Sequence, residues 1–358
     1  MNYRDFKQEM EKKISENLRK DYSDAYAKAS KIHMVNREVD SLGIVVCGQT
    51  IYPPIYLEQL YDRYNKICDI TIQKGLPENP MDVILDEVYE TIKQSVEKTP
   101  EALKGENGKL ENMPDNVVLQ LVNTDQNRYM LQNVPHREFE DLSIIYRWVV
   151  GVSDEGIYST IVTNEMAESV GIKEEELFRR AGENTKRILP AQIMSMYDAM
   201  VGFMVKDLMN SMPEELADVL GDESIDSMEE HVREKVIEEI GDDRPYPMFV
   251  ITNTERSFGA VEMLFPENLE QVSEIFHDDL YILPSSLHEV LAVPAKECDA
   301  QTLARMVVEV NSEEVPLEER LSNQVYYYDS REKKLSVATD TPNKRIDYYE
   351  PVQMAVAR

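Results

Sequence analysis

The sequence has few cysteines and no long apolar run. Its 358 residues include only three cysteines, Cys47, Cys68 and Cys298, and none of them lies in a CxxC spacing. An odd number of unpaired cysteines is typical of a reducing compartment rather than of a disulfide framework. No stretch reaches the roughly 18 apolar residues that a membrane-spanning helix needs, and the N-terminal residues lack the apolar core of a signal peptide. We therefore expect a cytoplasmic protein without a membrane partner.

Basic residues are also scarce. Lys and Arg number 38 against 68 Asp and Glu, which gives a net charge of -30. A chain with this balance gains little affinity by neutralising phosphates, so nucleic-acid binding through ordinary phosphate contacts is disfavoured. Hydrophobic residues still make up 42% of the sequence, enough to build folded cores. The length favours two or three domains.

Motifs for cofactors and metals are missing as well. Neither GxxxxGK[ST] nor GxGxxG occurs, so no segment matches the loops that hold nucleotide phosphates. His288 and Glu289 begin like an HExxH zinc motif, but Ala292 stands where the second histidine is needed. We expect no metal and no cofactor.

The acidic excess is concentrated in residues 211–243, which carry 13 acidic and 2 basic side chains. Apolar residues recur there at spacings of three and four, which predicts exposed amphipathic helices. Their inward stripe comprises Leu216, Leu220, Val232 and Val236. One interpretation is a solvated helical connector between two cores. The other is a docking surface for a basic partner, or a mimic of a nucleic-acid backbone.

Residues 192–212 contain six methionines at helical spacing. A methionine-rich helix can form an adaptable binding groove, but packing in a core is its more common role. We favour the core.

Helical spacing dominates the first hundred residues. Phe6, Met10, Ile14 and Leu18 stand four apart, which predicts an amphipathic helix that Tyr22 and Tyr26 continue to about Lys31. A strand-like run at 42–48 follows, then a helix begun by Pro53–Pro54 and another over 81–98. We expect a mainly helical region with a short hairpin over 1–104.

Strands become frequent after residue 110. Strand patterns occur at 117–123, at 141–164 as a hairpin with an SDEG turn, and at 247–253, 259–265, 280–284, 288–294 and 325–329. Helical segments separate them without strict alternation, which favours an α+β fold: an N-terminal helical part followed by mixed sheets with packed helices. We divide this part into an α/β region at 110–210, an acidic helical connector at 211–243 and a second α/β region at 244–358.

The segment YILPSSLHEVLAVP at 281–294 gathers the strongest candidates for chemistry. In an extended segment, Ser286 and His288 point to one face and Glu289 to the other. The Ser286 hydroxyl could then approach the imidazole, with a carboxylate such as Asp278 or Asp279 orienting the ring, as in hydrolases with an activated serine.

The same segment allows a structural interpretation. It has no GxSxG elbow and no identifiable oxyanion hole. Ser285 and Ser286 can satisfy backbone groups of a turn while His288 makes one buried hydrogen bond. The catalytic candidates are Ser286, His288 and Glu289; the binding candidates are Ser285, Ser286, His288 and Tyr56.

These residues resemble a bacterial family catalogued as domain of unknown function 5688. The resemblance rests on 281–294 and on four further segments, PPIYLEQLY at 53–61, 122–146, 248–265 and 309–329. It implies an intracellular bacterial protein, often from accessory or mobile regions of a genome, and it implies no activity.

Two functional hypotheses therefore remain. The leading one is a non-catalytic, acidic interaction protein whose partner is a protein, with a basic one favoured by the charge. The alternative is a hydrolase of unknown substrate centred on Ser286 and His288. The sequence leaves open whether the protein is an enzyme.

Overall fold

The computed structural model describes residues 1–46, 49–74, 79–97, 109–153, 156–211, 227–228, 230–236, 247–284 and 286–339. The chain divides into two compact units, residues 1–108 and 109–358. Both units combine helices with antiparallel sheets, so the predicted α+β class is confirmed. The finer division at residues 210 and 243 stays a prediction.

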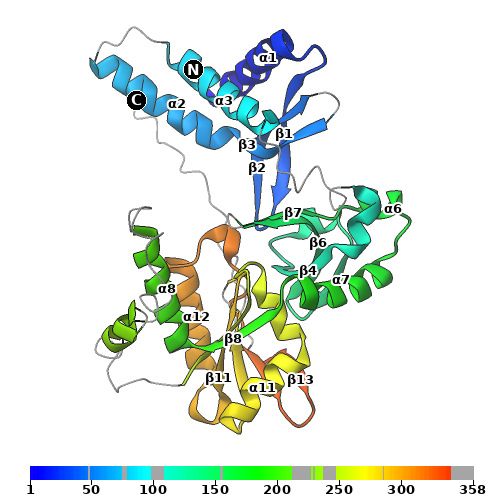
Figure 1. Ribbon diagram of the computed structural model, residues 1–358, viewed down its shortest axis with the longest axis vertical. Coiled ribbons are helices and arrows are strands. Elements are labelled where there is room, and N and C mark those ends of the chain that lie inside the picture. The colour runs from blue at the N-terminus through cyan, green and yellow to red at the C-terminus, as the bar shows by residue number, and fades with distance from the viewer. Residues whose placement is uncertain are drawn as a thin grey trace, which may run out of the picture. The chain divides into compact units, whose positions relative to one another are not determined.

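The first unit packs three helices against a three-stranded sheet in the order β1-β2-β3 (Figure 1). Its elements are α1 (Tyr3–Asp21), β1 (Tyr26–Met34), β2 (Arg37–Val46), β3 (Gln49–Tyr56), α2 (Leu57–Lys74) and α3 (Pro80–Glu97). The apolar stripe predicted for α1 is no more than 1% exposed and joins a core with α2, α3 and the sheet. The spacing of four therefore identified the buried face correctly.

Two predicted boundaries in this unit are wrong. The first helix ends at Asp21 rather than near Lys31, and residues 26–34 form strand β1. Tyr22 and Tyr26 continue the helical spacing, but pairing of β1 with β2 outweighs this local preference. The second helix begins at Leu57, because Pro53–Pro54 belong to β3. Strand β3 is an edge strand, where missing proline N–H groups are tolerated.

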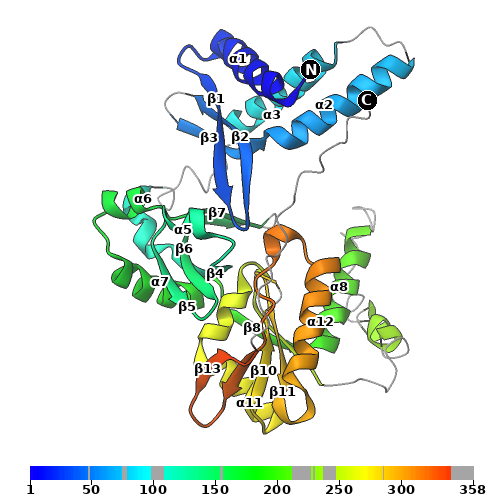
Figure 2. The same ribbon diagram turned by 180° about the vertical axis from the view of Figure 1, so that it is seen from behind.

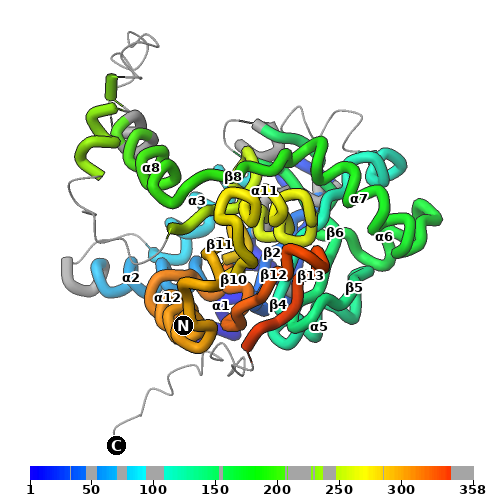
Figure 3. The backbone as a smooth tube through the Cα atoms, turned by 90° about the horizontal axis from the view of Figure 1, so that it is seen from below, coloured from blue at the N-terminus to red at the C-terminus, as the bar shows by residue number. Residues whose placement is uncertain are grey.

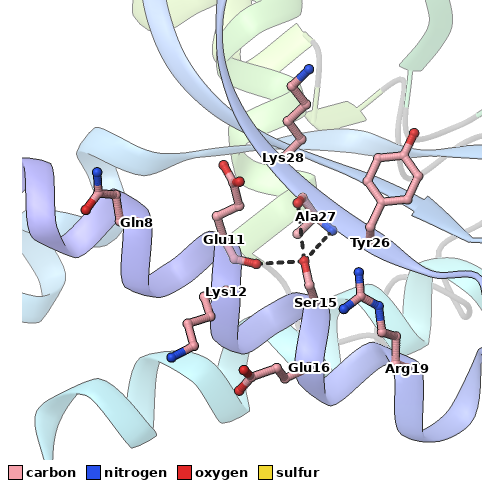
Figure 4. Close-up of a pocket in the computed structure, with 9 residues that line it drawn as sticks. All are labelled: Gln8, Glu11, Lys12, Ser15, Glu16, Arg19, Tyr26, Ala27 and Lys28. Carbon is pink, nitrogen blue, oxygen red and sulfur yellow. Dashed lines mark hydrogen bonds between the residues drawn. The ribbon is translucent and has the colours of Figure 1, made fainter.

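Strand β1 is the other edge of this sheet, and α1 covers the backbone groups that face away from β2 (Figure 4). Ser15 Oγ accepts a hydrogen bond from the N–H of Ala27 at 2.9 Å. Glu11 Oε2 accepts one from the N–H of Ala29 at 2.8 Å, and Arg19 Nε donates to the carbonyl of Ala25 at 3.2 Å. Side chains of α1 thus take the place of a neighbouring strand.

The second unit begins with a four-stranded sheet. Its strands are β4 (Val117–Asn123), β5 (His136–Phe139), β6 (Leu142–Ser153) and β7 (Gly156–Ile161), and β6 pairs with the other three. The helical elements around it are η2 (Leu110–Asp115), α5 (Arg128–Leu131), α6 (Asn164–Ser169) and α7 (Glu174–Ile188). Thr185 of α7 fastens this helix to the sheet, because its hydroxyl accepts from the N–H of Leu119 at 2.9 Å.

A six-stranded antiparallel sheet completes the second unit, in the order β13-β12-β10-β11-β9-β8 (Figure 3). Its strands are β8 (Ala191–Ser195), β9 (Phe249–Asn253), β10 (Leu280–Leu283), β11 (Val290–Pro294), β12 (Tyr326–Asp329) and β13 (Lys334–Val337). The helices are α8 (Met196–Ser211), α11 (Pro266–Phe276) and α12 (Ala300–Glu313), with short 3-10 turns η3 (Gly259–Leu264), η4 (Ala295–Glu297) and η5 (Leu317–Glu319).

Helix α12 covers one face of this sheet (Figure 2). Leu303 and Val307 of α12 pack with Leu283 of β10 and Val293 of β11. On α11, Phe276 meets Phe249 of β9 edge to face, with ring centroids 5.4 Å apart.

The two sheets of this unit are joined by polar contacts. The side-chain amide of Asn123 on β4 donates to the carbonyl of Leu321 at 3.0 Å. Asp141, just before β6, accepts from the hydroxyls of Ser322 and Tyr326.

Two predictions for this unit need correction. Residues 259–265 were expected to form a strand, but Gly259–Leu264 form η3. The residues from Gly259 to Met263 are all buried, so apolar and polar positions do not alternate, and short runs of this kind do not distinguish strand from helix. The methionine-rich segment is not helical throughout, because Met194 lies in β8.

Much of the acidic segment 211–243 lies outside the described residues, including Leu216 and Leu220. Residues 230–236 are helical, and Val232 and Val236 are buried against Val201 of α8. These two members of the predicted inward stripe do face a core. None of the described helices combines the length and the apolar character needed to cross a bilayer.

Candidate functional site

The candidate segment begins where β10 ends. Ser286 forms an isolated antiparallel bridge with Arg320, and the N–H of Leu287 donates to the carbonyl of Glu319 at 2.8 Å. The N–H of Ser322 donates to the carbonyl of Pro284 at 2.9 Å. The chain around Ser286 is therefore fixed by the segment that precedes β12. Ser285 lies outside the described residues.

The Ser286 hydroxyl is buried and has two partners. Its oxygen accepts from the backbone N–H of His288 at 3.0 Å, and it hydrogen-bonds to the carboxylate of Glu289. Burial raises the pKa of Glu289, while the charge of His288 and the bond from Ser286 partly offset that rise. The predicted separation of Ser286 and Glu289 on opposite faces is wrong, because residues 287 and 288 form a bend rather than an extended strand.

The His288 ring is held by a different set of groups. Its Nδ1 accepts from the backbone N–H of Phe258 at 3.4 Å, so its other nitrogen, Nε2, is the one that can donate. That nitrogen lies 3.7 Å from a carboxylate oxygen of Glu319. The expected orienting carboxylates lie elsewhere: Asp278 binds Lys296, and Asp279 binds Ser330 and Tyr327.

This geometry limits what Ser286 can do. No hydrogen bond joins the ring of His288 to the Ser286 hydroxyl, both of which are among the described residues. A serine nucleophile needs a base that accepts its proton, and here Glu289 is the side chain that contacts the hydroxyl. The arrangement favours a structural role, and the hydrolase hypothesis stays an alternative.

Tyr56, the fourth binding candidate, belongs to the first unit. It is half-buried at the end of β3, and the guanidinium carbon of Arg37 lies 5.8 Å from its ring centroid. This contact links β2 to β3 within that unit.

The sequence did not reveal the loop that supports His288. Asn253 organises it: its side-chain oxygen accepts from the N–H groups of Glu255 and Ser257 at 3.1 and 3.2 Å. Arg256 and Phe258 both adopt left-handed backbone conformations, with φ of 50° and 59°. The only sequence signal is the run NTERSFG, which is typical of a turn but says nothing about its neighbour.

The described residues contain no group of three or more His, Cys, Asp or Glu side chains placed to hold a metal ion.

A comparison with protein families decides how the chain is classified. The model of a family of unknown function (DUF5688) matches residues 3–330. The chain belongs to this family. Searches of curated proteins and of solved structures found no match. The DUF5688 match runs from α1 to just after β12, so it includes both units and the Ser286–Glu289 segment.

A pair of variants distinguishes the structural from the catalytic role in this DUF5688 protein. We expect Ser286→Ala to lower the free energy of unfolding by about 1–3 kcal/mol, because it removes the acceptor of the His288 N–H and a hydrogen-bonding partner of the half-buried Glu289. Ser312→Ala, at an exposed serine of α12, serves as the matched control and should stay within about 0.5 kcal/mol of wild type. Denaturant unfolding measures both.

The wild-type protein should also fail to react with a serine-directed fluorophosphonate probe. Stoichiometric labelling that maps to Ser286, together with unchanged stability of Ser286→Ala, would contradict the structural role.

Proposed function

We propose that the protein is a non-catalytic interaction module that binds a basic amphipathic helix of a partner protein. The observation that carries this proposal is the apolar surface of α8, where Met200, Phe203 and Leu208 are 36%, 56% and 43% exposed. Large apolar side chains grouped on one helix are a common feature of protein-binding surfaces.

Helix α8 is apolar on more than one side. Val201 is buried with Val232 and Val236, and Tyr197, Met204 and Val205 pack partly against that cluster. A helix that is apolar around most of its circumference is normally covered on every side. The exposed side therefore suits a partner helix, and the flexible side chain of Met200 can adapt to one.

Charge supports a basic partner. The acidic segment 211–243 follows α8 directly in the chain and carries 13 acidic and 2 basic residues. Opposite charges steer association and raise the rate at which a partner binds. A partner helix with apolar residues on one face and Lys or Arg on the other would match α8 and this segment together.

The cellular setting follows from other features. Cys68 and Cys298 are free and half-buried, which suits a reducing compartment, and we place the protein in the cytoplasm. The family resemblance suggests a bacterial protein of an accessory or mobile genetic region.

A lysine–leucine peptide that forms an amphipathic helix is a suitable probe. We expect it to bind in a fluorescence anisotropy titration, and a glutamate–leucine peptide of equal length to bind at least about tenfold more weakly. The double variant Met200→Ser, Phe203→Ser should lose about tenfold in affinity, because it removes the apolar contact. Raising the salt concentration should weaken binding further.

The control replaces two exposed apolar side chains on other helices by serine. Met306 of α12 and Ile275 of α11 are 43% and 50% exposed, and Met306→Ser, Ile275→Ser should bind the peptide as wild type does. Equal affinities of the two double variants, or no binding by wild type, would contradict the proposal.

A further inference from the structure

Arg147 is a partly desolvated cation with no anionic partner among the described residues. It lies on β6, beside β4 and β7 of the four-stranded sheet (Figure 2). Its guanidinium donates to Ser159 Oγ and to Gln120 Oε1, both at 3.1 Å, and to the carbonyl of Ser159 at 3.4 Å. All of these acceptors are neutral. No carboxylate of a described residue forms an ion pair with it.

The remaining contact of this guanidinium is aromatic. Its central carbon lies 4.4 Å from the ring centroid of Phe258, whose ring in turn lies 6.1 Å from that of His288. A cation over an aromatic ring gains less free energy than the desolvation of an ion costs. Burial accordingly lowers the pKa of Arg147 to about 10. Charges that are shielded from water are normally paired, and the described residues supply no counter-ion to this half-buried guanidinium.

Gln120 supplies a second unused donor at the same place. Its side chain on β4 is fully buried, and its oxygen accepts from Arg147. Its amide nitrogen Nε2 has no hydrogen-bond partner among the residues that the structure describes. Gln120 Nε2 and the neighbouring guanidinium of Arg147 can therefore donate hydrogen bonds to the same acceptor. Leaving such a buried donor unpaired destabilises the folded protein.

We propose that Arg147 and Gln120 form a binding site for an oxyanion, a phosphate or carboxylate group of a small ligand. The guanidinium binds the oxyanion through its remaining N–H groups, and Gln120 Nε2 donates a further hydrogen bond. Arg147 is half-buried, so part of this residue is in contact with solvent. The protein carries a net charge of -30, which repels anions from most of its surface. Specific binding of an anion therefore requires a local group of hydrogen-bond donors such as Arg147 and Gln120.

None of the residues of this site lies on α8, although Arg256, in the same loop as Phe258, places its guanidinium carbon 4.8 Å from the ring centroid of Phe203 on that helix. The site adjoins the candidate segment: Phe258 contacts the guanidinium of Arg147 and also donates its N–H to His288. An oxyanion bound at Arg147 would therefore lie close to the loop that holds the imidazole.

Thermal unfolding of the full-length protein tests the site. Sodium phosphate and sodium acetate are titrated against sodium chloride of equal ionic strength. We expect a saturable rise in the midpoint temperature with phosphate or acetate and not with chloride, and the more effective anion identifies the preferred group. Arg147→Met should weaken that anion at least about tenfold, since it removes charge-assisted hydrogen bonds. Arg305→Met, at an exposed arginine of α12, should leave the titration unchanged.

Gln120→Glu provides a test that does not require removal of the arginine. The new carboxylate would stand beside the guanidinium and supply the missing counter-ion from within the protein. We expect the midpoint temperature to rise by about 2–4 °C and the response to phosphate and acetate to disappear. The proposal is wrong if wild type gives no saturable response, if Arg147→Met retains it, or if Gln120→Glu lowers the midpoint temperature.

Discussion

Replacing Gly259 by alanine should prevent the second unit from reaching a stable fold. Gly259 is the first residue of η3 and is buried between β9 and the candidate segment. A Cβ atom at this position would lie 2.5 Å from the carbonyl oxygen of His288 and 2.9 Å from the backbone nitrogen of Asn253, and it would also overlap the hydroxyl of Thr252. Two of these neighbours are backbone atoms of separate elements, so neither can move without disturbing the sheet.

We expect Gly259→Ala to lower the free energy of unfolding by more than about 4 kcal/mol, measured by circular dichroism in denaturant. Gly182→Ala is the matched control, because a Cβ on that residue of α7 meets nothing within 4 Å. In a helix, this replacement should raise stability by up to about 1 kcal/mol. If the two variants unfold at the same denaturant concentration, the close packing around Gly259 does not hold the fold together.

Glu262→Gln should stabilise the protein at pH 8 and leave it nearly unchanged at pH 4.5. Glu262 is 1% exposed; one of its carboxylate oxygens has no hydrogen-bond partner, and the other accepts from the side-chain amide of Asn268 at 2.9 Å. Burial raises the pKa of Glu262 to about 7, although Asn268 and the charge of Lys186 oppose the rise. The folded protein therefore keeps this proton to a higher pH than the unfolded chain does.

The direction of the pH effect follows from this difference. Between pH 4.5, the ordinary pKa of the group, and about 7, the folded state binds more protons than the unfolded state, so stability falls as the pH rises. Above about pH 7 the loss is complete and amounts to about 3 kcal/mol. Glutamine cannot ionise, so Glu262→Gln removes this loss.

Urea unfolding at the two pH values measures the effect. Glu267→Gln serves as a control, because Glu267 is exposed and paired with Lys186, which lowers its pKa. That variant should be slightly less stable than wild type at pH 8, the opposite direction. A Glu262→Gln variant that changes stability equally at both pH values would show that Glu262 is ionised in the folded protein throughout.

The sequence predicted the structure correctly where one apolar face of a helix packs against a core. The spacing of Phe6, Met10, Ile14 and Leu18 identified the buried side of α1, because a helix that covers a core must repeat its apolar residues at that interval. The same spacing led to a wrong prediction at residues 22–34, whose side chains are compatible with a helix or a strand. There the pairing of β1 with β2 decides the outcome, and no local pattern encodes a partner strand.

The candidate site was predictable only in part. The run PSSLHE drew attention to this segment. Its spacing predicted a contact of the Ser286 hydroxyl with His288, whereas in the structure the hydroxyl contacts Glu289. The partners of the imidazole, Phe258 and Glu319, are 30 and 31 residues away in sequence, and they meet it through a loop with two left-handed residues. Such contacts arise from tertiary folding, so the sequence of the segment could not reveal them.

The hydrogen bonds from α1 to the outer edge of β1 have a consequence for how the chain is made. Helix α1 precedes β1, so during synthesis the helix leaves the ribosome first and is available as soon as the strand emerges. A nascent β1 thus meets Glu11, Ser15 and Arg19 before it can meet a strand of another copy. Proteolytic loss of α1 would leave the N–H groups of Ala27 and Ala29 free to pair with a strand of another copy. Helix α1 therefore protects this edge strand against self-association.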